Sequence, residues 1–418
     1  MLKHITKLIW KNRKTNGWIF AELLLVCSAL WFMADRSYVD LRTYYTPLGY
    51  DISNVWFLQL ESLSEGHPDY VPSADPSADL LRLREQVVQQ PWVEEACFAF
   101  YSSPYSFGNS WSSLYPVDGD TTVSAVRGFQ MRNVTPEYFD VFRVTDKNGN
   151  RISPSLVGKD SPLVISSDME AAFFPGSSGL GRRVSFDNNY AESYTIAAVC
   201  MPIRFDDYSK SEPCFYNCLR GSDFANRVAQ HRASSVEFSV KMKAKISAEE
   251  MNAWLLEMGE RLSVNNLYVY RAKEIATQRK ELLKVKHDGA KTQIAVVGFV
   301  LINVFFGIIG TFWLRTQARR GETGLRIAVG ASRFATRRFL YAEGLCLLAL
   351  TLPFVLLLAG NMLYFDIPDT HRIPYSLPRF LITFMGSYLL IAGMIVLGIS
   401  LPARKASRLA PAEALRYE

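Results

Sequence analysis

The residues of this 418-residue chain that could carry chemistry are its histidines, its cysteines and one glycine-rich segment. The five histidines are scattered without the close spacing that metal ligands need, so we expect surface or packing roles for them. Residues 176–181 are rich in glycine but lack the lysine of a P-loop, which indicates a turn and not a nucleotide site. The chain also contains no G-x-S-x-G and no H-E-x-x-H motif. The sequence therefore predicts no enzyme, with no catalytic residue, no metal site and no cofactor bound by this chain.

The six cysteines divide into two groups. Cys27 and Cys346 lie within long apolar runs, and the other four lie in the stretch between the first two runs. These four are Cys97, Cys200, Cys214 and Cys218. Disulfides form there if the stretch is outside the cytosol, and four cysteines allow three complete pairings between which the sequence does not choose. Cys214 and Cys218 could be bridged or could ligate a metal, but no histidine or further cysteine stands near them.

Four long apolar runs are candidates for membrane-spanning helices, and they determine on which side of the membrane the other residues lie. They occupy residues 18–34, 294–314, 339–361 and 380–401. The last three are long enough to cross about 30 Å of hydrocarbon as helices, and the first is at the short limit. A cleaved signal peptide is the alternative for the first run, but a cut after Ala34 would place a bulky phenylalanine at the −3 position. We therefore predict a membrane protein with four transmembrane helices.

Charge is distributed unevenly along the chain, and this assigns the two sides of the membrane. Residues 35–291 contain 28 Lys and Arg against 33 Asp and Glu, whereas the rest of the chain contains 18 against 7. Basic residues are retained on the cytoplasmic side of a membrane. Both termini and the loop after the second run are therefore predicted to be cytoplasmic. Because the positive charge belongs to segments that flank the membrane, nucleic-acid binding is not expected.

These assignments divide the chain into nine segments. They are a basic lead-in at 1–16, the first span at 17–34, an extracytoplasmic domain at 35–291, the second span at 292–314, a cytoplasmic loop at 315–338, the third span at 339–361, a short outer loop at 362–379, the fourth span at 380–401 and a cytoplasmic tail at 402–418. The fold class is thus a four-helix membrane protein with a large domain inserted between its first and second spans.

The pattern of the inserted domain is mixed, which predicts an α+β fold. Residues 79–90 read as an amphipathic helix that feeds a strand at 93–100, and residues 234–246 alternate strictly, which is typical of a half-buried strand. Ser247 and Glu250 are spaced as a capping box at the start of a helix. From 270 to 291 the pattern is helical and charged, which predicts a stalk helix leading into the second span.

The cytoplasmic loop is the best candidate for a functional surface. Read as a helix, it places Leu325, Ala328 and Val329 in a small apolar patch beside a stripe of arginines. Gly330 then supplies a helix stop, and Ser332 can cap a second helix. A helix, break and helix of this kind can dock in a groove of a soluble partner. The alternative is a basic loop that only fixes the topology.

Two motifs resemble those of the MacB/FtsX-like permeases of ABC transporters. The run E-T-G-L-R-I-A-V-G-A-S-R at 322–333 is similar to the family's coupling helix, which contacts the ATPase. Its residues at the family's positions are Glu322, Gly324, Leu325, Arg326, Ala328, Val329, Gly330, Ala331, Ser332 and Arg333. The run P-A-R-K-A-S-R-L-A-P-A-E-A-L-R at 402–416 resembles the family's closing motif, through Pro402, Arg404, Pro411, Glu413, Leu415 and Arg416.

Elements of the inserted domain also resemble the family's periplasmic core. These are N-V-T-P-E-Y-F-D at 133–140, the strand and helix at 163–175, and the turn and strand between 179 and 199. Nothing is recognisable over 36–78 and 206–232, where specificity for a substrate or partner would differ. Two acids lie within the predicted spans, Glu22 and Glu343. An acid that faces lipid is costly, so Glu22 is expected to face another helix.

The resemblance implies a multi-pass permease subunit of a bacterial inner membrane. Such a subunit couples ATP hydrolysis by a separate cytoplasmic ATPase, which binds the ATP and Mg²⁺, to movement of the periplasmic domain. It exports or extracts a substrate such as a drug, peptide or lipoprotein. A second permease subunit, identical or different, is implied, and an adaptor with an outer-membrane channel is a further partner in some systems. The alternatives are a mechanotransmission subunit that activates a cell-wall hydrolase or a sensor kinase, and a solitary membrane sensor or scaffold.

Overall fold

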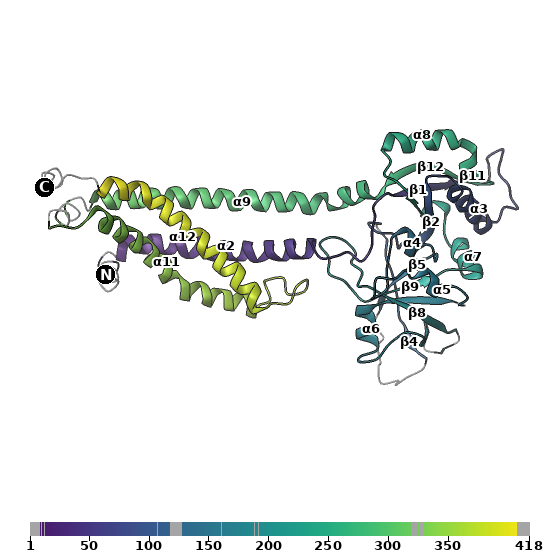
Figure 1. The fold of residues 1–418 in the computed structure, drawn as a ribbon, viewed down its shortest axis with the longest axis horizontal. Helices are drawn as coiled ribbons and strands as arrows, with labels where there is room; N and C mark the ends of the chain where they lie inside the picture. Colours follow the sequence, from purple (N-terminus) through teal and green to yellow (C-terminus); the bar gives the residue numbers. More distant parts are fainter. Residues whose placement is uncertain are drawn as a thin grey trace. The chain divides into compact units, whose positions relative to one another are not determined.

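The computed structural model describes residues 9, 11, 13–106, 108–117, 128–159, 161–187, 189–190, 192–318, 321, 325 and 329–407. The chain divides into two compact units (Figure 1). We call Met1–Tyr44 with Val285–Glu418 the membrane unit and Tyr45–Lys284 the sheet domain. Helix α9, Ile275–Ala318, begins in the sheet domain and continues into the membrane unit.

Among the described residues, four helices are long and apolar enough to cross a membrane. They are α2 (Arg13–Tyr44), α9 (Ile275–Ala318), α11 (Arg333–Tyr364) and α12 (Leu377–Ser407). All four extend beyond the predicted spans, and α11 and α12 each take in the edge of the predicted 362–379 loop. The most apolar 18-residue stretch of each helix is only partly buried within the protein. The buried share is 11% in α9 and 28–33% in the other three helices.

The membrane unit has a core that all four helices share. Trp31 of α2 and Val355 of α11 are fully buried, and Phe312 of α9 and Ile395 of α12 are nearly so. Close approach of α11 depends on Gly344, where a Cβ would lie 2.5 Å from Cδ1 of Ile399. The apolar side chains that face away from this core remain exposed, as is expected of helices that face lipid.

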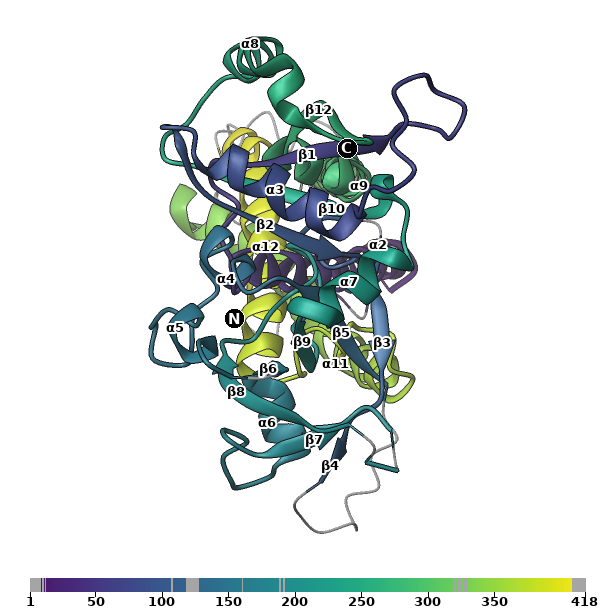
Figure 2. The ribbon, with the colours of Figure 1, turned by 90° about the vertical axis from the view of Figure 1, so that its right-hand side faces the viewer.

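The sheet domain is built on a twelve-stranded sheet in the order β11-β12-β1-β10-β2-β5-β9-β6-β8-β7-β4, with β3 paired to β5. Figure 2 shows the strands following one another in this order from β12 to β4. Its first part contains β1 (Val55–Ser62), α3 (Pro76–Val88), β2 (Val93–Phe100), β10 (Glu237–Met242), α8 (Ala248–Met258), η2 (Gly259–Leu262), β11 (Ser263–Val264) and β12 (Leu267–Glu274).

In this first part, the antiparallel order β12-β1-β10-β2 with helices after β1 and β10 is that of a ferredoxin-like fold. Leu83 of α3 and Trp254 of α8 are buried in one core with Phe98 and Phe238 of the strands. The expected capping box is present, because Ser247 Oγ accepts from Glu250 N–H and Glu250 Oε2 accepts from Ser247 N–H.

A second part of the sheet domain is inserted between β2 and β10. It contains β3 (Ser110–Ser112), β4 (Tyr115–Pro116), β5 (Phe129–Val134), α4 (Tyr138–Val141), α5 (Ser153–Leu156), β6 (Pro162–Ser166), α6 (Ser167–Phe173), β7 (Arg183–Ser185), β8 (Tyr194–Cys200), β9 (Cys214–Cys218), α7 (Gly221–Ala229) and η1 (Ala233–Ser235). Two pairs of its strands, β5 with β9 and β6 with β8, are parallel. Helices and strands share one domain, as the mixed sequence pattern predicts.

Two predicted elements are corrected by the sheet. The strand expected over 234–246 is shorter, and both faces of β10 are buried, because Lys241 pairs with Asp51 and Glu237 accepts the N–H groups of Ser102 and Ser103. The stalk helix was expected to begin at residue 270. Its first residues instead belong to β12, which pairs with β1 as far as Glu274.

All six cysteines are free and lie within the described residues. Cys200 and Cys214 stand on either side of Ser166 on three adjacent strands, which places their Cα atoms about 9.5 Å apart, beyond the reach of a disulfide. Cys214 and Cys218 begin and end one strand, about 13 Å apart. Cys97 lies on β2, which β5 separates from β9. The register of the sheet thus excludes pairing within this group of four.

Candidate functional site

The loop predicted to be cytoplasmic, 315–338, exposes Leu325, Val329 and Phe334 among its described residues. Leu325 is 56% exposed and Val329 is 81% exposed. Val329 N–H donates to Leu325 O at 3.0 Å, so the two residues lie one helical turn apart. Large apolar side chains at such exposure are suited to contact with another protein. Four further predicted contact residues, Glu322, Gly324, Arg326 and Ala328, lie outside the described residues.

The break after this turn has the expected form. Gly330 has φ +99°, a conformation that favours glycine, and no helix continues through it. Ser332 Oγ then accepts from Ala335 N–H at 3.2 Å and caps α11. Ala331 lies between the two, and Arg333 is the first residue of α11. The helical turn from Leu325 to Val329 therefore ends at Gly330, and α11 begins within a few residues.

The two predicted membrane acids lie on different helices of the membrane unit. Glu22 of α2 faces α9, where its Oε1 would be 2.6 Å from a Cβ placed on Gly307. Glu343 of α11 is only 1% exposed. Glu22 thus lies against another helix, and the absence of a side chain at residue 307 makes the space for it.

The closing motif is described only at its beginning. Pro402 is buried within α12, and Arg404 is exposed. The other four predicted positions, Pro411, Glu413, Leu415 and Arg416, lie outside the described residues. Within this motif, the ammonium group of Lys405 stands 4.4 Å from the ring centroid of Trp313 on α9, a cation–π contact between two helices.

A buried ion pair that the sequence did not predict joins α2 to α12. Arg379 Nε donates to Asp35 Oδ1 at 2.9 Å, and the side chains are 0% and 2% exposed. Nη1 of Arg379 donates to the backbone oxygens of Asp369 and Ile373, at 2.9 and 2.8 Å. Because the charge of Arg379 is paired and its hydrogen bonds are directed, it fixes the α11–α12 loop to the end of α2.

A second arginine, which lies in the α11–α12 loop, strengthens this connection. Arg372 donates to Asp40 of α2 at 2.7 Å and to Asp369 at 2.6 Å. Burial raises the pKa of Asp369, but hydrogen bonds and charge from Arg372 outweigh it and hold that pKa below its usual value. Asp369 is therefore ionised at neutral pH. Together these pairs hold the loop and α2 as one assembly, which we call the outer latch (Asp35, Asp40, Asp369, Arg372 and Arg379).

Within the sheet domain, a polar cluster holds the first turns of α9. Asp207 accepts from Tyr105 Oη at 2.9 Å and from Arg279 Nε at 3.1 Å, while Gln278 donates to Tyr105 O at 3.0 Å. Burial, followed by the neighbouring Tyr50 and Asp207, raises the pKa of Tyr105 well above its usual value. Tyr105 thus keeps the proton that it donates. We call Tyr105, Asp207, Gln278 and Arg279 the base cluster.

The base cluster also reaches the residues that follow α2. Arg204 donates to Thr46 O, Asp207 O and Ser209 O. Tyr50 donates to Phe205 O at 3.3 Å, and its pKa is raised to about 12, chiefly by burial. The loop between β8 and β9 therefore binds both the entry of the chain into the sheet domain and its exit through α9.

Sequence reasoning missed both clusters because their partners are far apart along the chain. Arg379 and Asp35 are 344 residues apart, and Arg279 and Asp207 are 72 apart. The sequence did contain a signal for the ion pair between Asp35 and Arg379. Asp35 directly follows the first apolar run, and Arg379 directly precedes the fourth apolar run. Opposite charges at the same end of two predicted spans are candidates for pairing.

The sequence matches no family model and no curated protein. The structure is similar to that of the periplasmic region of MacB from Actinobacillus actinomycetemcomitans, with a TM-score of 0.35, 13% sequence identity, and coverage of 58% of this chain and 97% of that one. It is also similar to the extracellular domain of the ABC-type transporter YknZ from Gram-positive bacteria, with a TM-score of 0.30, 12% identity, and coverage of 51% and 100%.

Proposed function

We propose that this chain is the membrane subunit of an ABC transporter of the MacB/FtsX-like kind. It couples ATP hydrolysis by a separate cytoplasmic ATPase to movement of the sheet domain on the other side of the membrane. The observation that carries the proposal is the exposed pair Leu325 and Val329, placed one turn apart in an arginine-rich loop between two membrane-length helices. The two motifs that resemble the family's coupling helix and closing segment support it.

The chain's own residues would transmit movement and would not bind nucleotide. ATP and Mg²⁺ would be held by the ATPase, whose closure displaces the loop and with it the ends of α9 and α11. Because α9 is one helix from Ile275 to Ala318, a displacement at its cytoplasmic end can reach the base cluster. There Arg279 and Gln278 pass it to the loop after β8. A second permease subunit, identical or different, would complete the assembly in the bacterial inner membrane, with both termini cytoplasmic.

A single apolar-to-charged change tests the coupling surface. Leu325→Asp places an uncompensated charge in the contact with the ATPase and is expected to weaken co-purification of the ATPase with the tagged full chain at least tenfold. The matched control is Leu256→Asp, which changes an 83% exposed leucine of α8 in the sheet domain and should leave co-purification unchanged. Equal recovery of the ATPase with Leu325→Asp and with the unchanged chain would refute the coupling surface.

The same coupling would serve export of a substrate or activation of a hydrolase or kinase. These functions differ in what the sheet domain binds. The distinction must therefore be sought in binding sites of that domain.

A further inference from the structure

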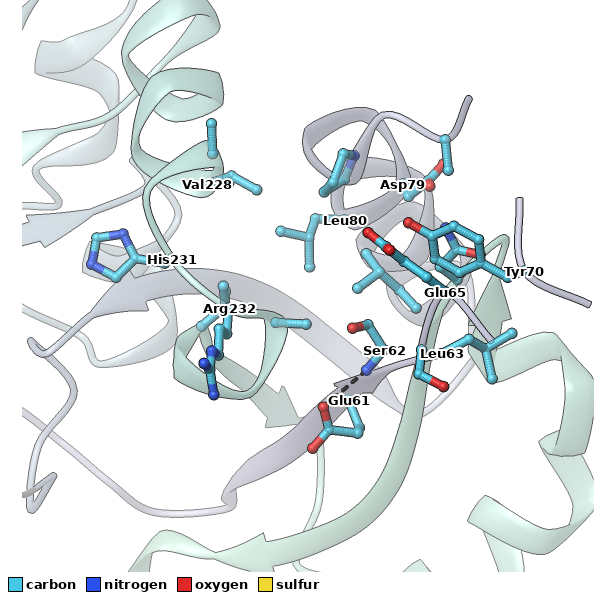
Figure 3. Close-up of a pocket in the computed structure, with 18 residues that line it drawn as sticks. Glu61, Ser62, Leu63, Glu65, Tyr70, Asp79, Leu80, Val228, His231 and Arg232 are labelled. Atoms are coloured by element: carbon cyan, nitrogen blue, oxygen red, sulfur yellow. Dashed lines mark hydrogen bonds between the residues drawn. The ribbon is translucent and has the colours of Figure 1, made fainter. Parts of the chain in front are cut away.

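The sheet domain contains a cavity of about 430 Å³ at the end of β1, between the start of α3 and the end of α7. This volume is within the range of sites that hold small ligands, about 300–1,000 Å³. Figure 3 shows Leu80 of α3 at its centre, with Glu65 and Tyr70 on one side and Arg232 on the other. The cavity is formed by the turn after β1, by α3 and by the segment that leads from α7 into β10.

The floor of the cavity is apolar. Leu80, Val228, Val236 and Leu267 line it and are each at most 5% exposed, because they also belong to the core beneath. An apolar side chain of a ligand would therefore find a dry contact surface there.

The rim of the cavity carries polar side chains that bind no described residue other than an immediate neighbour along the chain. The side chains of Glu65, Tyr70 and Arg232 form no hydrogen bond or ion pair there, and Glu61 accepts only the N–H of its neighbour Ser62. These groups are consequently free to bind a ligand.

A buried acid gives a second and independent sign of a binding site. Asp79 lines the cavity and is 1% exposed. Its Oδ1 accepts from Asn265 Nδ2 at 2.7 Å and lies 3.7 Å from Nη1 of Arg82, whereas its Oδ2 is buried and has no hydrogen-bond partner among the described residues. A buried carboxylate oxygen without a donor is rare in proteins, and here it leaves negative charge at the wall of the cavity.

The balance of charge selects the ligand. Glu61, Glu65 and Asp79 line the cavity together with Arg232, and Arg82 stands beside Asp79, so one negative charge is in excess. A cation is favoured near the acids and an apolar group over Leu80. Most of the lining also comes from the two segments, 36–78 and 206–232, in which the sequence shows no recognisable motif.

We propose that this cavity binds a short peptide segment that presents an apolar side chain next to a lysine or arginine. The apolar side chain lies on Leu80 and Val228, and the basic side chain pairs with Glu61 and Glu65. The inference extends the proposed function by naming the ligand class of the sheet domain. It does not depend on coupling to an ATPase.

Binding can be measured with capped tetrapeptides and the full chain in phosphatidylcholine nanodiscs. By calorimetry, acetyl-Leu-Lys-Leu-Lys-amide is expected to bind at least tenfold more tightly than acetyl-Leu-Glu-Leu-Glu-amide or acetyl-Ser-Lys-Ser-Lys-amide. Empty nanodiscs correct for adsorption to lipid. Since no ATPase is present, a negative result would leave the Leu325 test unaffected, and failure of that test would leave this one intact.

Variants assign the binding to the cavity. The pair Glu61→Gln and Glu65→Gln should weaken binding at least tenfold, and Ala74→Trp should abolish it by filling the cavity. The matched control pair, Glu257→Gln and Glu260→Gln, removes two exposed acids elsewhere in the sheet domain and should change nothing. The proposal is overturned if the leucine–lysine peptide does not bind, if the glutamate peptide binds as tightly, or if the cavity variants bind like the control pair.

Discussion

The guanidinium group of Arg379 has no exposed surface, and Asp35 provides its counter-charge. Two charges placed out of water gain little net stability from each other, but removing one of them leaves the other buried and unpaired. The outer latch is therefore sensitive to single substitutions and tolerant of paired ones. A latch of this kind specifies one position of the α11–α12 loop on α2.

We expect Asp35→Asn to destabilise the full chain by about 3–5 kcal/mol, because Arg379 stays buried and charged. Thermal unfolding of the purified protein in detergent measures the effect. Asp40→Asn is the matched control, since the Asp40 side chain is 31% exposed and its partner Arg372 keeps Asp369. The double change Asp35→Leu with Arg379→Met should recover much of the loss. A melting temperature of Asp35→Asn equal to that of the unchanged chain would contradict this role.

Lys241 is a buried charge of the sheet domain that likewise depends on one acidic partner. Because this partner titrates, its contribution to stability depends on pH. Its side chain is 2% exposed and donates to Asp51 Oδ2 at 3.2 Å and to Ser53 O at 2.6 Å. Burial raises the pKa of Asp51, but hydrogen bonds from Ser53 and the charge of Lys241 outweigh it, so the pKa lies below its usual value. The ionised Asp51 is thus favoured by folding.

Asp51→Asn should cost about 1–3 kcal/mol at pH 7, since a buried ammonium loses its counter-charge. The pKa of Asp51 is lower in the folded chain, so its contribution is complete above the unfolded value of about 4 and is lost as the pH falls through the folded value. Melting temperatures of the variant and the unchanged chain should therefore converge on acidification from pH 7 to pH 3. A difference that is constant over this range would exclude the titration of Asp51 as its source.

At the scale of elements, the sequence correctly predicted interactions whose two partners are close along the chain. Ser247 and Glu250 cap α8, and Ser332 caps α11, as their spacing predicts. Long-range pairing decided the rest. Lys241 and Asp51 are 190 residues apart, so the sequence pattern predicted that the polar face of β10 is exposed. In the same way, the pairing of β12 with β1 makes a strand of the residues where the stalk helix was expected to begin. The base cluster escaped prediction for the same reason.

The packing of α11 against its neighbours allows a prediction at this scale. A Cβ on Gly344 would lie 2.5 Å from Cδ1 of Ile399 and 2.8 Å from Cγ2 of Ile395, both within the helical core. Gly344→Ala should thus destabilise the membrane unit by about 1–3 kcal/mol through overpacking. Gly360→Ala, in the same helix with nothing within 4 Å, is the control and should have little effect. Equal melting temperatures for the two variants in detergent would show that α11 can shift to make room.

At the scale of the whole molecule, each unit has apolar cores of its own. Among the described residues, the shared core of α2, α9, α11 and α12 contains none of the sheet domain, and the cores around Phe98, Tyr138 and Phe173 contain none of the membrane unit. A unit with its own core can fold alone. Thr46 and Arg279 stand close to the two chain ends of the sheet domain, and both are bound to the loop after β8.

We therefore expect residues 45–284 to unfold cooperatively as a soluble fragment, and residues 45–274 to be markedly less stable. The shorter fragment lacks Arg279 and Gln278, so Asp207, which is 2% exposed, keeps a buried charge without its arginine. The loss should be about 3 kcal/mol or more, which lowers the melting temperature of a domain of this size by roughly 6–12 °C. Thermal unfolding followed by circular dichroism compares the stabilities of the two fragments.

The variant Asp207→Asn shows whether the unpaired charge causes the difference. In the shorter fragment it removes the unpaired charge and should restore part of the lost stability. In the longer fragment the same change should lower the stability. If both fragments melt at one temperature, the first turns of α9 are not held by the base cluster, and the transmission of movement through Arg279 fails with it.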